Sequence, residues 1–226
     1  MQIIKVSQSQ DREAWLDARR GIITGTKAKT VAPPARGKAT PQGIYELLAE
    51  KVAIQKDGEP ERDRGLRLED EALLLTAEKF NLDFNLDAGM WLSDDGKLGI
   101  SPDAAEVSDT PTYAGEAKCL DSKIHLQAII NDYLAKKLPN YNPLNSLKIA
   151  SSDYRQQAIQ YFVINEHCNT LYFTLYDDRV ALDNVMHYVI VIKRDDVQEY
   201  VESQEAYERD ALEQVNEMIN VLKEIK

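Results

Sequence analysis

Two short stretches of the sequence are the most informative: Ser101-Pro102-Asp103-Ala104 and Gly115-Glu116-Ala117-Lys118-Cys119. Together they read Pro-Asp, a dozen residues and then Glu-Ala-Lys. Because alternate side chains of a strand face the same side of a sheet, a strand through the second stretch places Glu116 and Lys118 together. Magnesium prefers hard oxygen ligands, and an attacked phosphodiester needs positive charge beside it. The sequence therefore predicts a metal site with two carboxylates and one lysine that cuts phosphodiester bonds.

The residues around Asp103 indicate how the two stretches meet. Residues 90–92 and 98–100 are typical of short strands, and Asp94-Asp95-Gly96 between them is typical of a tight turn. Asp103 then lies at the exit of a hairpin, and residues 113–120 form a third strand. We expect these strands to form a meander whose ends converge on one metal. The alternative is an ordinary turn followed by a solvated strand, because Pro-Asp pairs and Glu-x-Lys triplets also occur there.

The composition is that of a soluble globular protein. The chain has 226 residues, of which 43% are hydrophobic and 29% charged, so we expect a single domain over residues 1–226. No apolar run is long enough to span a membrane, and residues 1–5 do not read as a secretory signal. Cys119 and Cys168 lack metal-ligand spacing and the three histidines are scattered, which argues against a zinc site. We expect reduced thiols, a cytoplasmic protein and no membrane partner.

The charges are unevenly distributed along the chain. The net charge of −11 argues by itself against a nucleic-acid partner. However, residues 18–45 contain no Asp or Glu and carry six basic residues. A second acid-free window, residues 133–152, carries three lysines, whereas the chain from Asp195 onward is rich in acids. We expect the basic windows to face a polyanion, and the alternative is that they are ordinary loops.

The hydrophobic pattern predicts an α/β fold with a mixed central β-sheet flanked by helices. The predicted helices span residues 11–19, 24–31, 44–54, 66–80, 124–133, 152–164 and 197–225. Two further strands are predicted at 170–176 and 187–192, and loops at 32–42, 56–62 and 139–147.

Six motifs occur in an order that is more specific than any one of them. They are Trp15 through Arg19-x-Gly21-Ile22-Ile23-Thr24-x-Thr26, Gly65-x-x-x-Glu69, Ser101-Pro102-Asp103, Glu116-Ala117-Lys118-Cys119, the glutamines 156, 157 and 160, and Leu171-Tyr172-Phe173-x-x-Tyr176-Asp177. In this order the motifs resemble the lambda exonuclease-like phage alkaline exonucleases, also called the YqaJ-like viral recombinase family. That family belongs to the PD-(D/E)XK nuclease superfamily, and the resemblance covers most of the chain.

The resemblance implies an activity and a set of partners. It implies Mg²⁺-dependent digestion of one strand of double-stranded DNA from a 5′-phosphorylated end, which leaves a 3′ single-stranded overhang for recombination. It further implies a ring-shaped homotrimer that threads the duplex and works beside a single-strand annealing protein.

The resemblance also implies roles for particular residues. Asp103, Glu116 and the carbonyl of Ala117 would ligate two Mg²⁺ ions, for which Mn²⁺ can substitute. Lys118 would be the catalytic lysine, and Glu69 would assist the second ion or the attacking water. The residue-level alternative for Glu69 is an exposed acid in the first turn of a helix.

A 5′ end also needs a group that recognises its phosphate. By the same resemblance, Arg19 and Thr26 would hold the terminal 5′-phosphate. An arginine can contact phosphate through two parallel hydrogen bonds, and the helix that opens near Thr24 offers free N–H groups to an anion. The alternatives are a surface salt bridge for Arg19 and a helix cap for Thr26.

Two positions depart from the family pattern. The family's catalytic glutamine falls where this chain offers both Gln156 and Gln157, and we favour Gln157 because it shares a helical face with Tyr161. The family also carries apolar, strand-separating residues shortly before the position of Gly65. This chain has Glu61-Arg62-Asp63-Arg64 there. The pattern therefore does not identify the residue that separates the two DNA strands, and Arg62 is one candidate.

Three other functions compete with the exonuclease. A PD-(D/E)XK endonuclease, of the restriction or junction-resolving kind, would share the core chemistry and cut internally. A non-catalytic DNA-end clamp would keep the fold without turnover. A small acidic enzyme would act on something other than nucleic acid.

Overall fold

The computed structural model describes residues 61–224 and, before them, Tyr45, Ala49 and Ala53. The helices predicted at 11–19 and 24–31, the loop predicted at 32–42 and most of the helix predicted at 44–54 lie outside the described residues. Arg19 and Thr26 lie outside them as well. The loop predicted at 56–62 overlaps a helix that begins at Glu61.

The centre of the molecule is a five-stranded mixed sheet in the order β1-β4-β5-β6-β7. Its strands are β1 (Phe84–Asn85), β4 (Ala104–Glu106), β5 (Tyr113–Lys118), β6 (Thr170–Tyr176) and β7 (His187–Lys193). β5 and β6 run parallel, and the other neighbouring pairs run antiparallel. The predicted mixed α/β sheet is therefore confirmed.

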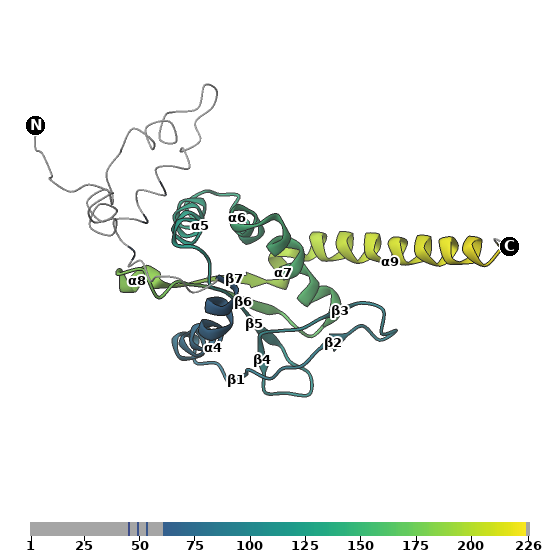
Figure 1. Ribbon diagram of the computed structural model, residues 1–226, viewed down its shortest axis with the longest axis horizontal. Coiled ribbons are helices and arrows are strands. Elements are labelled where there is room, and N and C mark those ends of the chain that lie inside the picture. Colours follow the sequence, from purple (N-terminus) through teal and green to yellow (C-terminus); the bar gives the residue numbers. More distant parts are fainter. Residues whose placement is uncertain (1–44, 46–48, 50–52, 54–60, 225–226) are drawn as a thin grey trace, which may run out of the picture.

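Helices cover both faces of this sheet (Figure 1). α4 (Glu61–Phe80) packs on one face through a small apolar cluster that includes Leu68, Leu73 and Ala117. A larger core on the other face joins the sheet to α5 (Ser122–Ala135), α6 (Pro143–Ala150), α7 (Ser152–Ile164) and the first turns of α9 (Arg194–Glu224). α8 (Asp183–Met186) lies between β6 and β7, and α9 extends far from the body. Among the described helices, none combines the length and apolar character needed to cross a bilayer.

The alternation of side chains along β5 determines which layer each of them reaches. Glu116 and Lys118 point toward α7, whereas Gly115 and Ala117 point toward α4. A Cβ atom on Gly115 would lie 2.8 Å from Leu73 Cδ2 and 2.9 Å from the Phe84 ring. Glycine at this position therefore lets α4 pack closely against the strand that carries the predicted site.

Short polar residues set the ends of the helices near the site. The side chain of Asp121 accepts a hydrogen bond from the Lys123 N–H at the start of α5, and Ser151 accepts one from Asp153 at the start of α7. α4 ends before Asn81, whose positive φ of 53° is the left-handed conformation common just after helices.

The predicted meander is wrong in one respect. The strands expected at 90–92 and 98–100 do form a hairpin, β2 (Trp91–Leu92) and β3 (Gly99–Ile100), but this hairpin is a separate two-stranded sheet. β5 instead pairs with β4, which begins directly after Asp103. The sequence did not predict β4 because it is short and contains Ala-Ala-Glu, which has little β-propensity. Burial of both alanines stabilises this strand in the folded protein.

The loop predicted at 139–147 is also partly wrong, because α6 begins inside it at Pro143. The Asn142 side chain caps this helix by accepting a hydrogen bond from the Leu144 N–H, and proline is well tolerated at the first helical position. Pro and Asn thus mark a helix start here, and the tertiary burial of Leu144 and Leu147 holds it in place.

Candidate active site

Glu116 is the centre of the predicted site and is completely buried. Its Oε1 atom contacts Lys118 Nζ and accepts a hydrogen bond of 2.6 Å from Gln157 Nε2. Its Oε2 atom accepts a hydrogen bond from the Tyr161 hydroxyl. β5 and α7 together therefore hold this carboxylate from both sides.

Asp103 lies beside this carboxylate at the start of β4. Its Oδ2 atom accepts a 2.9 Å hydrogen bond from the backbone N–H of Ala117. Since the N–H and C=O of one strand residue point to the same neighbouring strand, the Ala117 carbonyl is also directed toward the Asp103 side of β5. The three predicted ligands, Asp103, Glu116 and Ala117, are thus brought together near the C-terminal end of the central strand β5.

Glu69 reaches the site from the opposite layer, on the first half of α4. Burial raises the pKa of Glu69, and the adjacent carboxyl of Asp103 raises it further. The Asp103 carboxyl therefore lies close enough to Glu69 to oppose the ionisation of Glu69.

Lys118 is the one described cation in contact with this group of acids. Burial opposes its charge, but the charge of Glu116 outweighs that effect and raises the pKa of Lys118. Its Nζ atom lies 5.6 Å from the centre of the Tyr154 ring, and one fifth of its side chain is exposed. Lys118 therefore remains protonated at neutral pH and is accessible from solvent.

The site carries more negative charge than its lysine can balance. Burial raises the pKa of Glu116 to about 7, and Asp103 acts in the same direction, although Lys118 and Tyr161 oppose this rise. Glu69, Asp103 and Glu116 share one positive side chain. A divalent cation would relieve this imbalance.

The donor set fits a magnesium-type ion. Within residues 61–224 and the three described positions before them, no three His, Cys, Asp or Glu side chains are arranged to hold a metal by themselves. Magnesium commonly takes only one or two protein carboxylates and completes its shell with water and phosphate oxygens. Asp103, Glu116 and the carbonyl of Ala117 supply such a set of hard oxygen atoms.

The structure distinguishes the two candidate glutamines. Gln157 donates to Glu116, whereas Gln156 is exposed and its backbone carbonyl accepts a hydrogen bond from Gln204 on α9. Gln157 is therefore the glutamine at the site, and its catalytic role stays a prediction. The sequence did not single out Tyr154, although its spacing of three residues before Gln157 places both on one face of α7.

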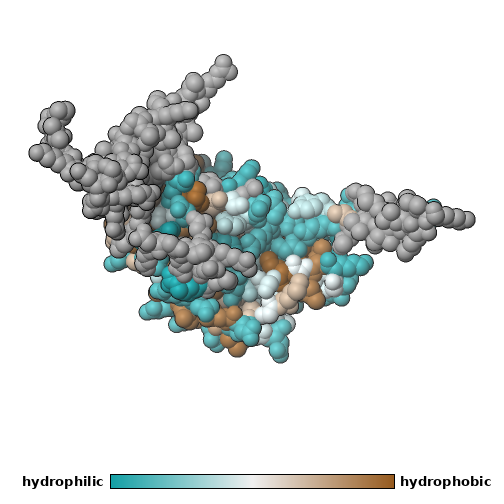
Figure 2. Space-filling model, viewed as in Figure 1, coloured by the Kyte–Doolittle hydropathy of each residue, from teal (hydrophilic) through white to brown (hydrophobic). Residues whose placement is uncertain are grey.

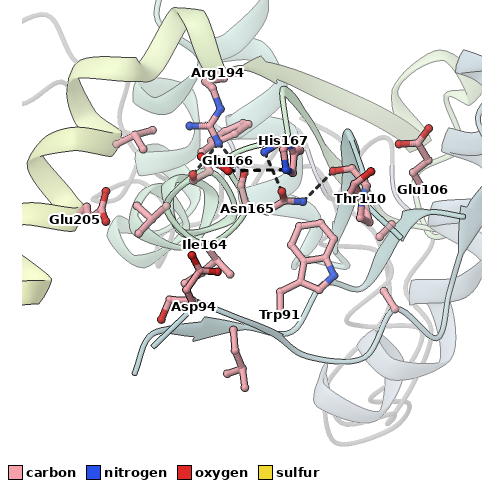
Figure 3. Close-up of a pocket in the computed structure, with 18 of the residues that line it drawn as sticks. Trp91, Asp94, Glu106, Thr110, Ile164, Asn165, Glu166, His167, Arg194 and Glu205 are labelled. Carbon is pink, nitrogen blue, oxygen red and sulfur yellow. Dashed lines mark hydrogen bonds and ion pairs between the residues drawn. The ribbon is translucent and has the colours of Figure 1, made fainter. Parts of the chain in front are cut away.

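A separate pocket of about 620 Å³ lies beside the C-terminal end of α7 (Figure 3). Its wall includes Trp91, Asn165, Arg194 and six acidic residues, and none of the described residues predicted for catalysis lines it. The Arg194 guanidinium donates to the carbonyls of Phe162, Asn165 and Cys168. The acids would repel a phosphodiester. The hydrogen-bond donors of Arg194 are used by backbone carbonyls at the C-terminal end of α7 and just beyond it.

The fold resembles that of solved exonuclease structures. The crystal structure of LHK-Exo in complex with dAMP aligns with a TM-score of 0.53 and 19% identity, over 95% of this chain and 100% of that one. The crystal structure of the alkaline exonuclease LHK-Exo from Laribacter hongkongensis aligns with a TM-score of 0.52 and 21% identity, over 93% and 97%. No protein-family model and no curated protein matches the sequence. The resemblance inferred from the motifs is thus confirmed at the level of the fold.

Proposed function

We propose that this chain is a divalent-cation-dependent exonuclease that digests one strand of duplex DNA from a 5′-phosphorylated end and leaves a 3′ overhang. The observation that carries the proposal is the convergence of Asp103, Glu116 and Lys118 near the C-terminal end of β5. The shared fold with an alkaline exonuclease supports the same class of reaction.

Each side chain has a task that its surroundings suit. The protonated Lys118 stabilises the negative charge that develops on the attacked phosphate, and preorganised charges of this kind typically change rates by about 10²-fold or more. Gln157 is neutral, so it orients a water molecule without repelling the phosphate. Glu69, whose pKa is raised, assists in positioning that water. When bound by Asp103, Glu116 and the Ala117 carbonyl, two Mg²⁺ or Mn²⁺ ions supply the activation of water and the neutralisation of phosphate charge.

The proposal extends to the DNA end and to the assembly. Arg19 and Thr26 hold the terminal 5′-phosphate, and their window of six basic residues without an acid suits a polyanion. A homotrimeric ring around the duplex, a single-strand annealing partner and a cytoplasmic setting complete the proposal. Their support is the motif resemblance set out above.

The test is digestion of 5′-phosphorylated linear duplex DNA beside covalently closed circular duplex. We expect mononucleotides from the linear DNA with Mg²⁺, no cutting of the circle, and no digestion after chelation of the metal. Asp103→Ala should lower the rate of digestion by about 10³-fold or more, while DNA binding stays intact.

Other outcomes would overturn the proposal in distinct ways. Cutting of the circle into discrete fragments would identify an endonuclease. DNA binding without turnover, with either Mg²⁺ or Mn²⁺, would identify an end clamp. Absence of DNA binding, or binding that does not weaken with added salt, would remove nucleic acid as the substrate.

A further inference from the structure

The hydroxyl of Tyr161 connects the two halves of the site. The side chain is completely buried, and its hydroxyl donates to Oε2 of Glu116. Burial raises the pKa of Tyr161, and the nearby backbone of Asp103 opposes this rise, so Asp103 lies beside the same hydroxyl. The Tyr161 hydroxyl on α7 therefore lies beside both acidic residues proposed as metal ligands, one on β5 and one directly before β4.

This hydroxyl also determines which part of Glu116 remains available. A carboxylate offers about two lone pairs on each oxygen. Oε1 already accepts from Lys118 and Gln157, whereas Oε2 accepts from Tyr161 alone in the interactions described above. The hydrogen bond from Tyr161 therefore selects the orientation in which Oε2 presents its second lone pair.

The ring of Tyr161 in turn packs against the hairpin of β2 and β3. The Trp91 ring packs edge-on against the Tyr161 ring, with 6.1 Å between centroids. The neighbours of Trp91 on either side, Met90 and Leu92, point outward and are 66% and 54% exposed. Figures 1 and 2 show the molecule in the same view. In Figure 2, apolar surface is visible in the region where Figure 1 places this hairpin. Trp91 is thus the residue of β2 that the hairpin directs inward.

We infer that Tyr161 is a positioning residue for Asp103 and Glu116, and that Trp91 acts through it by fixing the ring. This inference rests on the proposed metal-dependent reaction. The β2–β3 hairpin, which lies outside the central sheet, then fixes the position of the Tyr161 ring beside the site. Removal of the groups that orient a metal ligand commonly weakens metal binding or activity by about 10–100-fold.

The experiment compares Tyr161→Phe, Trp91→Phe and Trp91→Ala with the unaltered full chain. Calorimetric titration with Mn²⁺ in the absence of DNA measures metal affinity, and digestion of linear duplex measures kcat and KM separately. Tyr161→Phe should weaken Mn²⁺ binding by about 10-fold and lower kcat at least as much, with KM for DNA unchanged. Trp91→Ala should change both quantities in the same direction and less, and Trp91→Phe should restore most of the loss.

Two controls separate positioning from packing. Met90→Ala and Leu92→Ala alter the two exposed neighbours of Trp91 and should leave Mn²⁺ affinity and kcat unchanged. In a double-mutant cycle, Trp91→Ala added to Tyr161→Phe should cause no further loss of Mn²⁺ affinity, because Trp91 acts through the hydroxyl.

Specific results would overturn the inference. If Tyr161→Phe lowers only the unfolding temperature and leaves Mn²⁺ affinity and kcat as in the unaltered chain, Tyr161 is a packing residue. If the unaltered chain binds Mn²⁺ but digests no DNA, the proposed function fails, while the calorimetric comparison still decides the positioning role. If the unaltered chain does not bind Mn²⁺, both fail.

Discussion

Glu116 and Asp132 are two completely buried carboxylates with similar neighbours and opposite electrostatics. Glu116 contacts a lysine, a tyrosine hydroxyl and a glutamine amide. Asp132, on α5, contacts Lys136 Nζ at 2.7 Å and the hydroxyls of Tyr141 and Tyr188 at 2.8 and 2.7 Å. The sequence offers each acid a lysine within four positions, so neither pattern alone separates a site from a structural network.

The difference lies in the net charge of the two surroundings. Burial alone would raise both pKa values, but the donors around Asp132 outweigh it and lower the pKa of that acid. Around Glu116 the donors do not outweigh burial, because Asp103 adds negative charge, and the pKa rises to about 7. A network that balances its own charge stabilises the fold, whereas an excess of buried negative charge favours an added cation.

The substitution Glu116→Gln should have the largest effect on the difference between the two carboxylates. The amide is nearly isosteric but removes the charge that a metal needs, so we expect digestion to fall by about 10³-fold or more. The free energy of unfolding at pH 8 should rise by about 1–2 kcal/mol, because the penalty for ionising a buried carboxyl builds up from its unfolded pKa of 4.5 and is complete above its folded pKa of about 7. Activity assays and urea denaturation measure the two effects, and a destabilised, still active variant would contradict the assignment.

The matched change in the second network is Asp132→Asn. It removes the charge that Lys136 and the two tyrosine hydroxyls satisfy, so the free energy of unfolding should fall by about 2–3 kcal/mol. Digestion per folded molecule should remain within about twofold of the unaltered protein. Denaturation at pH 8 and an assay normalised to folded protein check this prediction. A large loss of kcat at unchanged stability would show that Asp132 belongs to the reaction.

The polar contact between His187 and Thr76 shows the same effect of burial on a group that is positive when charged. We expect it to give the smallest change in stability of the three. His187 Nε2 lies 2.9 Å from the Thr76 hydroxyl, and burial together with Lys79 lowers the pKa of His187 from 6.5 to about 4. The unfolded chain therefore binds the proton more tightly. The stability that neutral His187 provides is fully present above pH 6.5 and is lost as the pH falls toward 4, by about 1–3 kcal/mol given its partial exposure.

The variant His187→Gln should remove this dependence and keep a polar group near Thr76. The difference in unfolding free energy between the variant and the unaltered protein, measured at pH 5 and at pH 8, isolates the contribution of His187. Equal differences at the two pH values would show that His187 is not held neutral by the fold.

Local patterns predicted much of the fold. The long apolar strand at 170–176 was found with the predicted bounds, and α7 begins and ends where its cap and periodicity indicated. The local pattern does not predict β4 or α6, because Ala104-Ala105-Glu106 has little β-propensity and a Pro-Asn segment is typical of a loop. In both cases burial in the core, which depends on distant residues, overrides the local preference.

The candidate site was predictable to a similar degree. The pairing of Glu116 with Lys118 follows from the period of a strand, and Gln157 follows from the period of a helix. The contact of the Ala117 N–H with Asp103 does not follow from either, because it depends on how β4 pairs with β5. The part of the prediction that concerns Arg19 and Thr26 lies outside the described residues.

The shared faces of β5 and of α7 can be derived from the order of residues, since those relations depend only on the local periods of two and 3.6 residues. The packing of the chain brings Glu69, Asp103, Glu116 and Tyr161 together from distant parts of the sequence. It also decided the charge balance of each cluster, because burial and the distances between residues far apart in the chain are properties of the packed molecule.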